Sequence, residues 1–189
     1  MKLLEDRIRK DGKVAPGNVL KVDCFLNHQI DVPFLSELGR EFYRLFKDEG
    51  ITKVLTIEAS GIGIACLTAS YFNVPVVFAK KTPTNNISGD VYTSEVYSYT
   101  HETTYTIRVA KDFLTAQDRV LIIDDFLAKG SALLALLKLV EDAGASVAGA
   151  GIVIEKSYQP GRAIVEEKGL RVESLARIAS MEDGEIVFL

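Results

Sequence analysis

The stretch VLIIDDFLAKGSA, residues 120–132, decides the fold. Its first four residues are apolar and predict a buried strand, and the apolar spacing of residues 130–143 predicts a helix. Between them lie two adjacent acids and a short loop of small residues. In open α/β folds, ligands bind where such strands end. We therefore expect a ligand site at this strand-to-helix junction.

The residue types at the junction favour a phosphorylated sugar. Backbone N–H groups of the loop can converge on a phosphate, and the start of the following helix adds partial positive charge. Asp124 and Asp125 can accept hydrogen bonds from sugar hydroxyls. One Asp at a strand end usually only caps the next turn, but two acids before a glycine-containing loop indicate a ribose 5-phosphate site. The expected phosphate-binding residues are Ala128, Lys129, Gly130, Ser131 and Ala132.

Strand and helix patterns alternate on both sides of this stretch. The apolar runs at 51–57, 74–79, 119–123 and 146–154 predict strands, with helices between them. Continuous apolar strands interleaved with helices indicate an α/β fold with a parallel sheet covered on both faces. The Tyr- and Thr-rich stretch 91–109 predicts a β-ribbon, whereas 161–189 breaks into short pieces.

The chain has 189 residues, of which 48% are hydrophobic, and predicts one domain spanning 1–189. We expect a core at about 35–155, a small hood from 1–34 and 156–189, and a mobile loop and ribbon at about 80–109. The net charge of −4 argues against nucleic acid as a partner. No apolar run is long enough for a membrane span, so we expect a cytoplasmic protein. Cys24 and Cys66 lie in apolar surroundings and are expected to be buried free thiols.

Residues 120–132 resemble the phosphoribosyl-pyrophosphate (PRPP) signature of the type I phosphoribosyltransferases. The usual signature has Thr at the positions of Lys129 and Ala132, and Gly at that of Ser131. The looser loop found here resembles the xanthine branch of the family. The resemblance implies the type I fold, a homodimer, and Mg²⁺ held mainly by substrate oxygens rather than by a protein cage.

The resemblance also assigns the pyrophosphate and base sites. Ser60 and Gly61, in the turn after the first core strand, would bind pyrophosphate, although alone they read as an ordinary tight turn. Lys80 and Lys81 would bind it too, from the same or the partner subunit, or would be a solvated pair. The base-contacting positions are Leu20, Asn27 and Lys156.

The implied reaction transfers the 5-phosphoribosyl group from PRPP to xanthine and gives XMP and pyrophosphate. Asp124 and Asp125 would be the catalytic carboxylates. Lys156 would donate to the 6-oxo group, which excludes adenine, and Asn27 would bind the 2-oxo edge that hypoxanthine lacks. Two alternatives remain open: a guanine or hypoxanthine phosphoribosyltransferase, and a non-catalytic regulator that senses PRPP.

Overall fold

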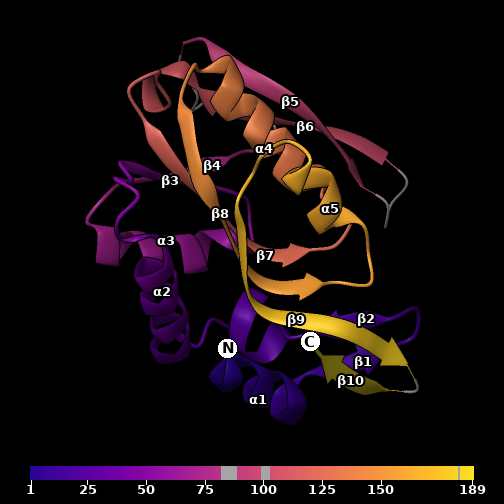
Figure 1. Cartoon of the computed structure of the whole chain (residues 1–189). Coiled ribbons are helices and arrows are strands. Elements are labelled where there is room, and N and C mark those ends of the chain that lie inside the picture. Colours follow the sequence, from indigo (N-terminus) through magenta and orange to yellow (C-terminus); the bar gives the residue numbers. More distant parts are fainter. Residues whose placement is uncertain (82–88, 99–102, 183) are drawn as a thin grey trace.

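The computed structural model describes residues 1–81, 89–98, 103–182 and 184–189. Within these residues, the central sheet has six strands in the order β10-β9-β8-β7-β3-β4 (Figure 1). The strands β3, β4, β7, β8 and β9 are parallel, and β10 is antiparallel to β9. Their bounds are β3 Lys53–Ile57, β4 Val76–Ala79, β7 Arg119–Leu127, β8 Ser146–Lys156, β9 Val172–Glu182 and β10 Glu185–Phe188. The predicted parallel sheet is confirmed.

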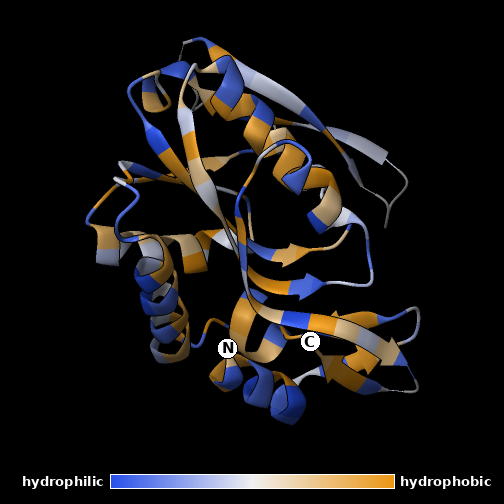
Figure 2. Cartoon of the chain, in the orientation of Figure 1, coloured by the Kyte–Doolittle hydropathy of each residue, from blue (hydrophilic) through white to orange (hydrophobic). Residues whose placement is uncertain are grey.

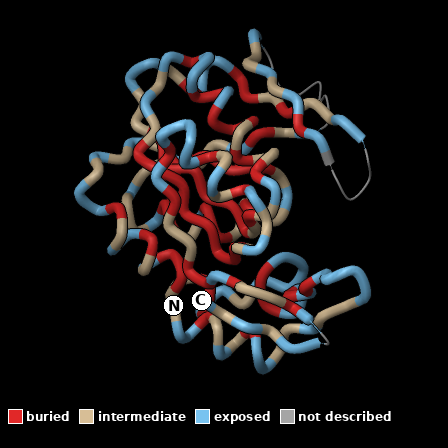
Figure 3. Tube along the Cα trace, turned by 45° about the vertical axis from the view of Figure 1, so that its right-hand side comes forward, coloured by how far each residue is buried: buried red, intermediate tan, exposed pale blue. Residues whose placement is uncertain are grey.

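Helices and a ribbon cover the two faces of the sheet. On one face lie α2 (Val32–Phe46) and α3 (Gly61–Phe72). On the other lie α4 (Ser131–Asp142), α5 (Gly161–Glu166) and the antiparallel ribbon of β5 (Val91–Ser98) and β6 (Thr103–Ala110), which ends in a short 3-10 turn, Lys111–Phe113. The central strands are therefore buried (Figure 3).

The start of β7 explains why its sequence is a continuous apolar run. Leu121 and Ile123 pack in the cluster under α2 and α3, whereas Val120 and Ile122 pack in the cluster under α4. Successive side chains of a strand point to opposite faces, so a strand covered on both sides needs apolar residues at every position.

The sequence of α2 explains where the helix begins and which of its faces is buried. The side chain of Asp31 accepts a hydrogen bond from the Phe34 N–H at 3.2 Å, and Pro33 occupies the first turn. Leu35, Leu38 and Phe42 recur at helical spacing and are buried. The hydrophilic side of α2 faces outward (Figure 2).

The two chain ends meet in a small hood beside the sheet (Figure 1). It contains α1 (Lys2–Asp11), the hairpin of β1 (Lys13–Ala15) and β2 (Val19–Lys21), and a π-helical turn, η1 (Asp23–Asn27). The N-terminal amine donates to the Leu175 carbonyl, and the Leu189 N–H donates to the Arg177 carbonyl at 2.9 Å. Both ends of the chain are thus bonded to β9.

The C-terminal stretch differs from the prediction of short pieces. β9 is an eleven-residue strand that pairs with β8 and extends the central sheet. Its polar residues obscured the strand pattern. Two of them, Ser174 and Arg177, bond to the buried Glu155 of β8, although Arg177 is also exposed to solvent.

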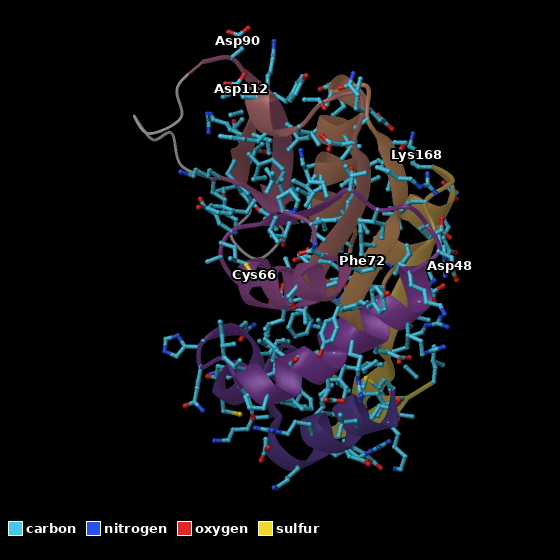
Figure 4. The ribbon with its side chains drawn as sticks, turned by 90° about the vertical axis from the view of Figure 1, so that its left-hand side faces the viewer. Asp48, Cys66, Phe72, Asp90, Asp112 and Lys168 are labelled. Atoms are coloured by element: carbon cyan, nitrogen blue, oxygen red, sulfur yellow. The ribbon has the colours of Figure 1, made fainter. Side chains whose placement is uncertain are left out.

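The prediction that the cysteines are buried was wrong: Cys24 and Cys66 are free thiols, but both are exposed. Cys66, which is labelled in Figure 4, belongs to α3. A residue in an apolar segment of a helix can still face outward, because the side chains of a helix point in all directions around its axis.

The predicted ribbon is confirmed by β5 and β6. Parts of the predicted loop, 82–88 and 99–102, lie outside the described residues. No described helix is long and apolar enough to cross a membrane.

Candidate active site

A cavity of about 580 Å³ opens at the carboxyl ends of β7 and β8. It brings together Asp124, the predicted phosphate loop 128–132, and Lys156. The ribbon contributes Tyr97 and Tyr105 to its wall. The remaining lining residues come from the hood, from β5, from β7, from α4 and from the segment after β8: Gly17, Asn18, Val19, Val96, Phe126, Leu127, Leu133, Tyr158 and Gln159.

The phosphate loop is shaped by two glycines. Gly130 has a φ of +84°, which favours glycine, and α4 begins at the next residue. The Gly161 N–H donates to the Ala128 carbonyl at 3.0 Å, and a Cβ at Gly161 would lie 2.4 Å from that oxygen. The first turn of α5 therefore supports the loop directly. Sequence reasoning missed Gly161, because a Pro-Gly pair after a strand indicates only a turn.

The two acids form a buried pair. Asp124 and Asp125 are 6% and 8% exposed, and the Asp125 N–H donates to Asp124 Oδ1 at 3.0 Å. Burial, followed by the charge of Asp125, raises the pKa of Asp124 well above its ordinary value, while Lys81 acts in the opposite direction. Burial and the charge of Asp124 raise the pKa of the Tyr105 hydroxyl. The pair is suited to hydroxyl donors or a cation.

The predicted pyrophosphate turn lies next to Asp124. Ser60 is half-buried and precedes α3, which begins at Gly61. A Cβ at Gly61 would lie 2.1 Å from Thr56 Oγ1 and 3.5 Å from Asp124 Oδ1. Any side chain there would collide with the Thr56 hydroxyl, so this position needs glycine.

The side chains of Lys80 and Lys81, which follow β4, point to different sides of the chain. The ammonium of Lys81 lies 5.2 Å from the centre of the Tyr105 ring, and its backbone N–H donates to Glu58 Oε1 at 2.5 Å. Lys80 instead lines a second cavity of about 480 Å³ with Phe78 and Arg108. Adjacent residues in extended backbone point to opposite sides, so within one subunit only Lys81 lies toward Asp124.

The three predicted base positions converge only in part. Lys156 lines the cavity, its Nζ donates to the Asn18 carbonyl at 3.0 Å, and burial lowers its pKa. Asn27 lies at the end of η1, and its Nδ2 donates to Asp125 Oδ2 at 3.2 Å. Leu20 is buried in the hood core, so its neighbours Asn18 and Val19 form the cavity wall there.

Sequence reasoning also missed Glu155, which precedes Lys156 in β8. Glu155 is 1% exposed and accepts hydrogen bonds from the side chains of Ser157, Arg162, Ser174 and Arg177. Burial raises its pKa, but the hydrogen bonds from Arg162, Ser174 and Ser157 outweigh burial and hold the pKa at about 2. This network ties the end of β8 to α5 and β9. An acid near a strand end normally predicts exposure, so no sequence signal marked it.

The loop 128–132, the adjacent carboxylates and a lysine-bearing cavity lie at the edge of a parallel sheet, as a protein that binds a phosphorylated sugar beside a second ligand would require. The family of the phosphoribosyl transferase domain matches residues 30–174. The chain is 61% identical over 190 residues to the xanthine phosphoribosyltransferase of Lachnoclostridium phytofermentans, covering 100% of this chain and 98% of the relative. It is 55% identical to xanthine phosphoribosyltransferase 1 of Clostridium perfringens, with both chains fully covered.

A solved structure agrees with the family and its fold. An adenine phosphoribosyltransferase from Giardia lamblia, complexed with 9-deazaadenine, matches with a TM-score of 0.79 and 27% identity, over 94% of this chain and 98% of that chain. The chain therefore belongs to the phosphoribosyltransferase family, and within it to the xanthine phosphoribosyltransferases.

Proposed function

We propose that this protein transfers the 5-phosphoribosyl group of PRPP to a ring nitrogen of xanthine, giving XMP and pyrophosphate in purine salvage. The bond between C1′ of the ribose and pyrophosphate breaks, and pyrophosphate leaves with the electron pair. The bond from C1′ to the base nitrogen forms, and the proton of that nitrogen is released. One observation carries the proposal: the phosphate loop, Asp124 and Lys156 line a single cavity.

The donor would be held at both of its phosphate ends. The N–H groups of loop 128–132 and the start of α4 would bind the 5-phosphate. Ser60, Gly61 and Lys81 would bind pyrophosphate, with Lys80 acting in the partner's site. Asp124 and Asp125 would accept hydrogen bonds from the ribose hydroxyls and stabilise the positive charge that develops on the ribose.

The donor chemistry of the site fits Mg²⁺. This ion keeps octahedral geometry and is usually bound by one or two carboxylates together with substrate oxygens and water. Asp124 and Asp125 would lie beside an ion on the ribose and pyrophosphate oxygens. When bound, the ion would neutralise charge on the leaving pyrophosphate.

Base selection would depend on Lys156, Asn27 and Leu20. An ammonium accepts no hydrogen bond, so Lys156 favours a 6-oxo group over the 6-amino group of adenine. Asn27 would meet the 2-oxo edge, and Leu20, which is buried, would support the base from behind the cavity wall formed by Asn18 and Val19. Asn27 reaches toward the site through its bond to Asp125.

A competition assay tests the function. The protein is incubated with PRPP, Mg²⁺ and equimolar xanthine, guanine, hypoxanthine and adenine, and the nucleotides are separated and quantified. We expect mostly XMP. If the product were mostly GMP or IMP, the proposed reaction would stand, but the assignment of xanthine as the base would be wrong. PRPP binding without any nucleotide product would favour a PRPP-sensing regulator.

We also propose that the whole chain, 1–189, is one unit that acts in the cytoplasm as a homodimer, through the face that carries β4. This strand ends the sheet, and exposed sheet edges are usually covered. Phe78 on β4 is 37% exposed and lines the second cavity with Lys80 and Arg108.

Phe78→Glu is expected to separate the subunits, because it places a charge in an apolar contact. Light scattering after size exclusion should give twice the chain mass of 20.8 kDa for the wild type and one chain mass for the variant. Leu3→Glu is the control, since Leu3 is an exposed apolar residue of the hood. A monomeric wild type, or a dimeric Phe78→Glu, would refute this interface.

A further inference from the structure

Thr56 has a buried hydroxyl that the proposed mechanism does not use. Thr56 is a residue of β3, is 0% exposed, and its Oγ1 has no hydrogen-bond partner within the described part of the chain. Leaving a hydroxyl buried and unpaired is unfavourable, and most buried polar side chains have a partner. A Thr in such a place therefore calls for an explanation.

The hydroxyl lies where the pyrophosphate turn meets the carboxylate pair. The position that a Gly61 Cβ would occupy is 2.1 Å from Thr56 Oγ1 and 3.5 Å from Asp124 Oδ1. The hydroxyl thus fills the space left by the missing side chain of Gly61. Asp124 already accepts the Asp125 N–H at 3.0 Å, but a carboxylate can accept several further hydrogen bonds.

We propose that Thr56 is a positioning residue for the phosphoribosyl donor: when PRPP binds, its hydroxyl donates a hydrogen bond to the Asp124 carboxylate. This inference rests on the proposed function. The bond would connect the turn that holds pyrophosphate to the carboxylate that holds the ribose. The C1′–pyrophosphate bond that breaks lies between these two groups, so the connection would set the geometry of the donor rather than that of the base.

A second threonine provides a matched control. Thr68 of α3 is also 0% exposed, and its Oγ1 likewise has no partner among the described residues. It lies near Gly39 of α2, where the two helices pack, and contributes nothing to the cavity. The two threonines therefore share burial and an unpaired hydroxyl, and differ in their distance from the carboxylates.

The test uses Thr56→Val, Thr56→Ser and Thr68→Val in the full chain. Valine keeps the shape of threonine and removes the hydroxyl, so neither Val variant should unfold at a lower temperature than the wild type without ligand. We expect Thr56→Val to raise the KM for PRPP about tenfold or more and to reduce the Tm increase that PRPP with Mg²⁺ produces. The KM for xanthine at saturating PRPP should stay unchanged. Thr56→Ser should restore wild-type values, and Thr68→Val should leave the kinetics unaltered.

The outcomes separate this inference from the function. Wild-type PRPP kinetics in Thr56→Val would overturn it, as would equal losses in Thr56→Ser, because the effect would then come from packing. Equal losses in Thr68→Val would do the same. The proposed function itself fails if the wild type shows neither turnover nor a Tm increase with PRPP, and the inference then falls with it.

Discussion

Asp124→Asn is expected to stabilise the ligand-free protein while removing most of its activity. Asp124 is buried beside Asp125, and burial together with that neighbouring charge raises its pKa. Ionising such a group in the folded state is unfavourable, and a neutral amide of the same shape avoids this penalty. We expect the free energy of unfolding near neutral pH to increase, which should appear as a Tm above that of the wild type. The loss in kcat/KM should be about 10²–10³-fold, as for other groups that stabilise developing charge.

The pH dependence of this gain follows from the direction of the pKa shift. The pKa of Asp124 in the folded protein lies above the ordinary value of 3.8. The destabilisation of the wild type by this group is therefore absent below pH 3.8 and grows as the pH rises toward the folded pKa. The Tm difference between Asp124→Asn and the wild type should therefore be larger at pH 8 than at pH 4.5. Scanning calorimetry at both pH values measures it.

Asp48→Asn is the control, because Asp48 is exposed at the surface (Figure 4) and does not line the cavity. It should change neither Tm nor activity. If Asp124→Asn lowered the Tm at every pH, the carboxylate would stabilise the fold as a hydrogen-bond acceptor. The proposal that its buried charge destabilises the ligand-free protein would then be wrong.

Lys156→Ala is expected to impair the use of the base and to leave the use of PRPP nearly intact. A hydrogen bond from a charged donor contributes about 1.5–3 kcal/mol, so kcat/KM for xanthine should fall on the order of 10–100-fold. Lys156 lines the cavity, but it belongs to β8 and not to loop 128–132, and its Nζ donates to the Asn18 carbonyl of the hood. The Tm increase produced by PRPP with Mg²⁺ should therefore persist.

The same variant should also weaken discrimination between bases. Without the ammonium, nothing in the Lys156 position opposes a 6-amino group, so the ratio of kcat/KM for xanthine to that for adenine should decrease. Lys168→Ala is the control, since Lys168 is exposed after α5 (Figure 4). Loss of the PRPP response in Lys156→Ala would show that the base pocket has been placed at the wrong end of the cavity.

The phosphate loop and the carboxylates could be predicted because they are local. Residues 120–132 contain the strand, the acids, the loop and the start of α4 in one continuous segment, so local geometry is enough to bring them together. The base positions were assigned by resemblance alone. Asn27 and Lys156 come from distant parts of the chain. Packing of the hood brings Asn27 to Asp125, and the pairing of β8 with β7 brings Lys156 to the same edge of the sheet.

The supporting groups could not be predicted, because each depends on a contact between distant segments. Gly161 is required by the Ala128 carbonyl, and Glu155 is buried because Arg162, Ser174 and Arg177 satisfy its charge. In sequence, a glycine predicts a turn and a glutamate predicts exposure. The same reason explains β9, in which the polar residues Ser174 and Arg177 bond to Glu155 of the neighbouring strand.

The sequence by itself determined the class of fold, through continuous apolar strands. The residue types of 120–132, at short spacing, also predict phosphate and ribose binding there, which stays a prediction. Only the tertiary structure decided which predicted residues share a cavity. It separated Lys80 from Lys81, placed Leu20 in the hood core, and put the Thr56 hydroxyl between the pyrophosphate turn and Asp124. Burial and distance arise from packing between segments, and no local pattern encodes them.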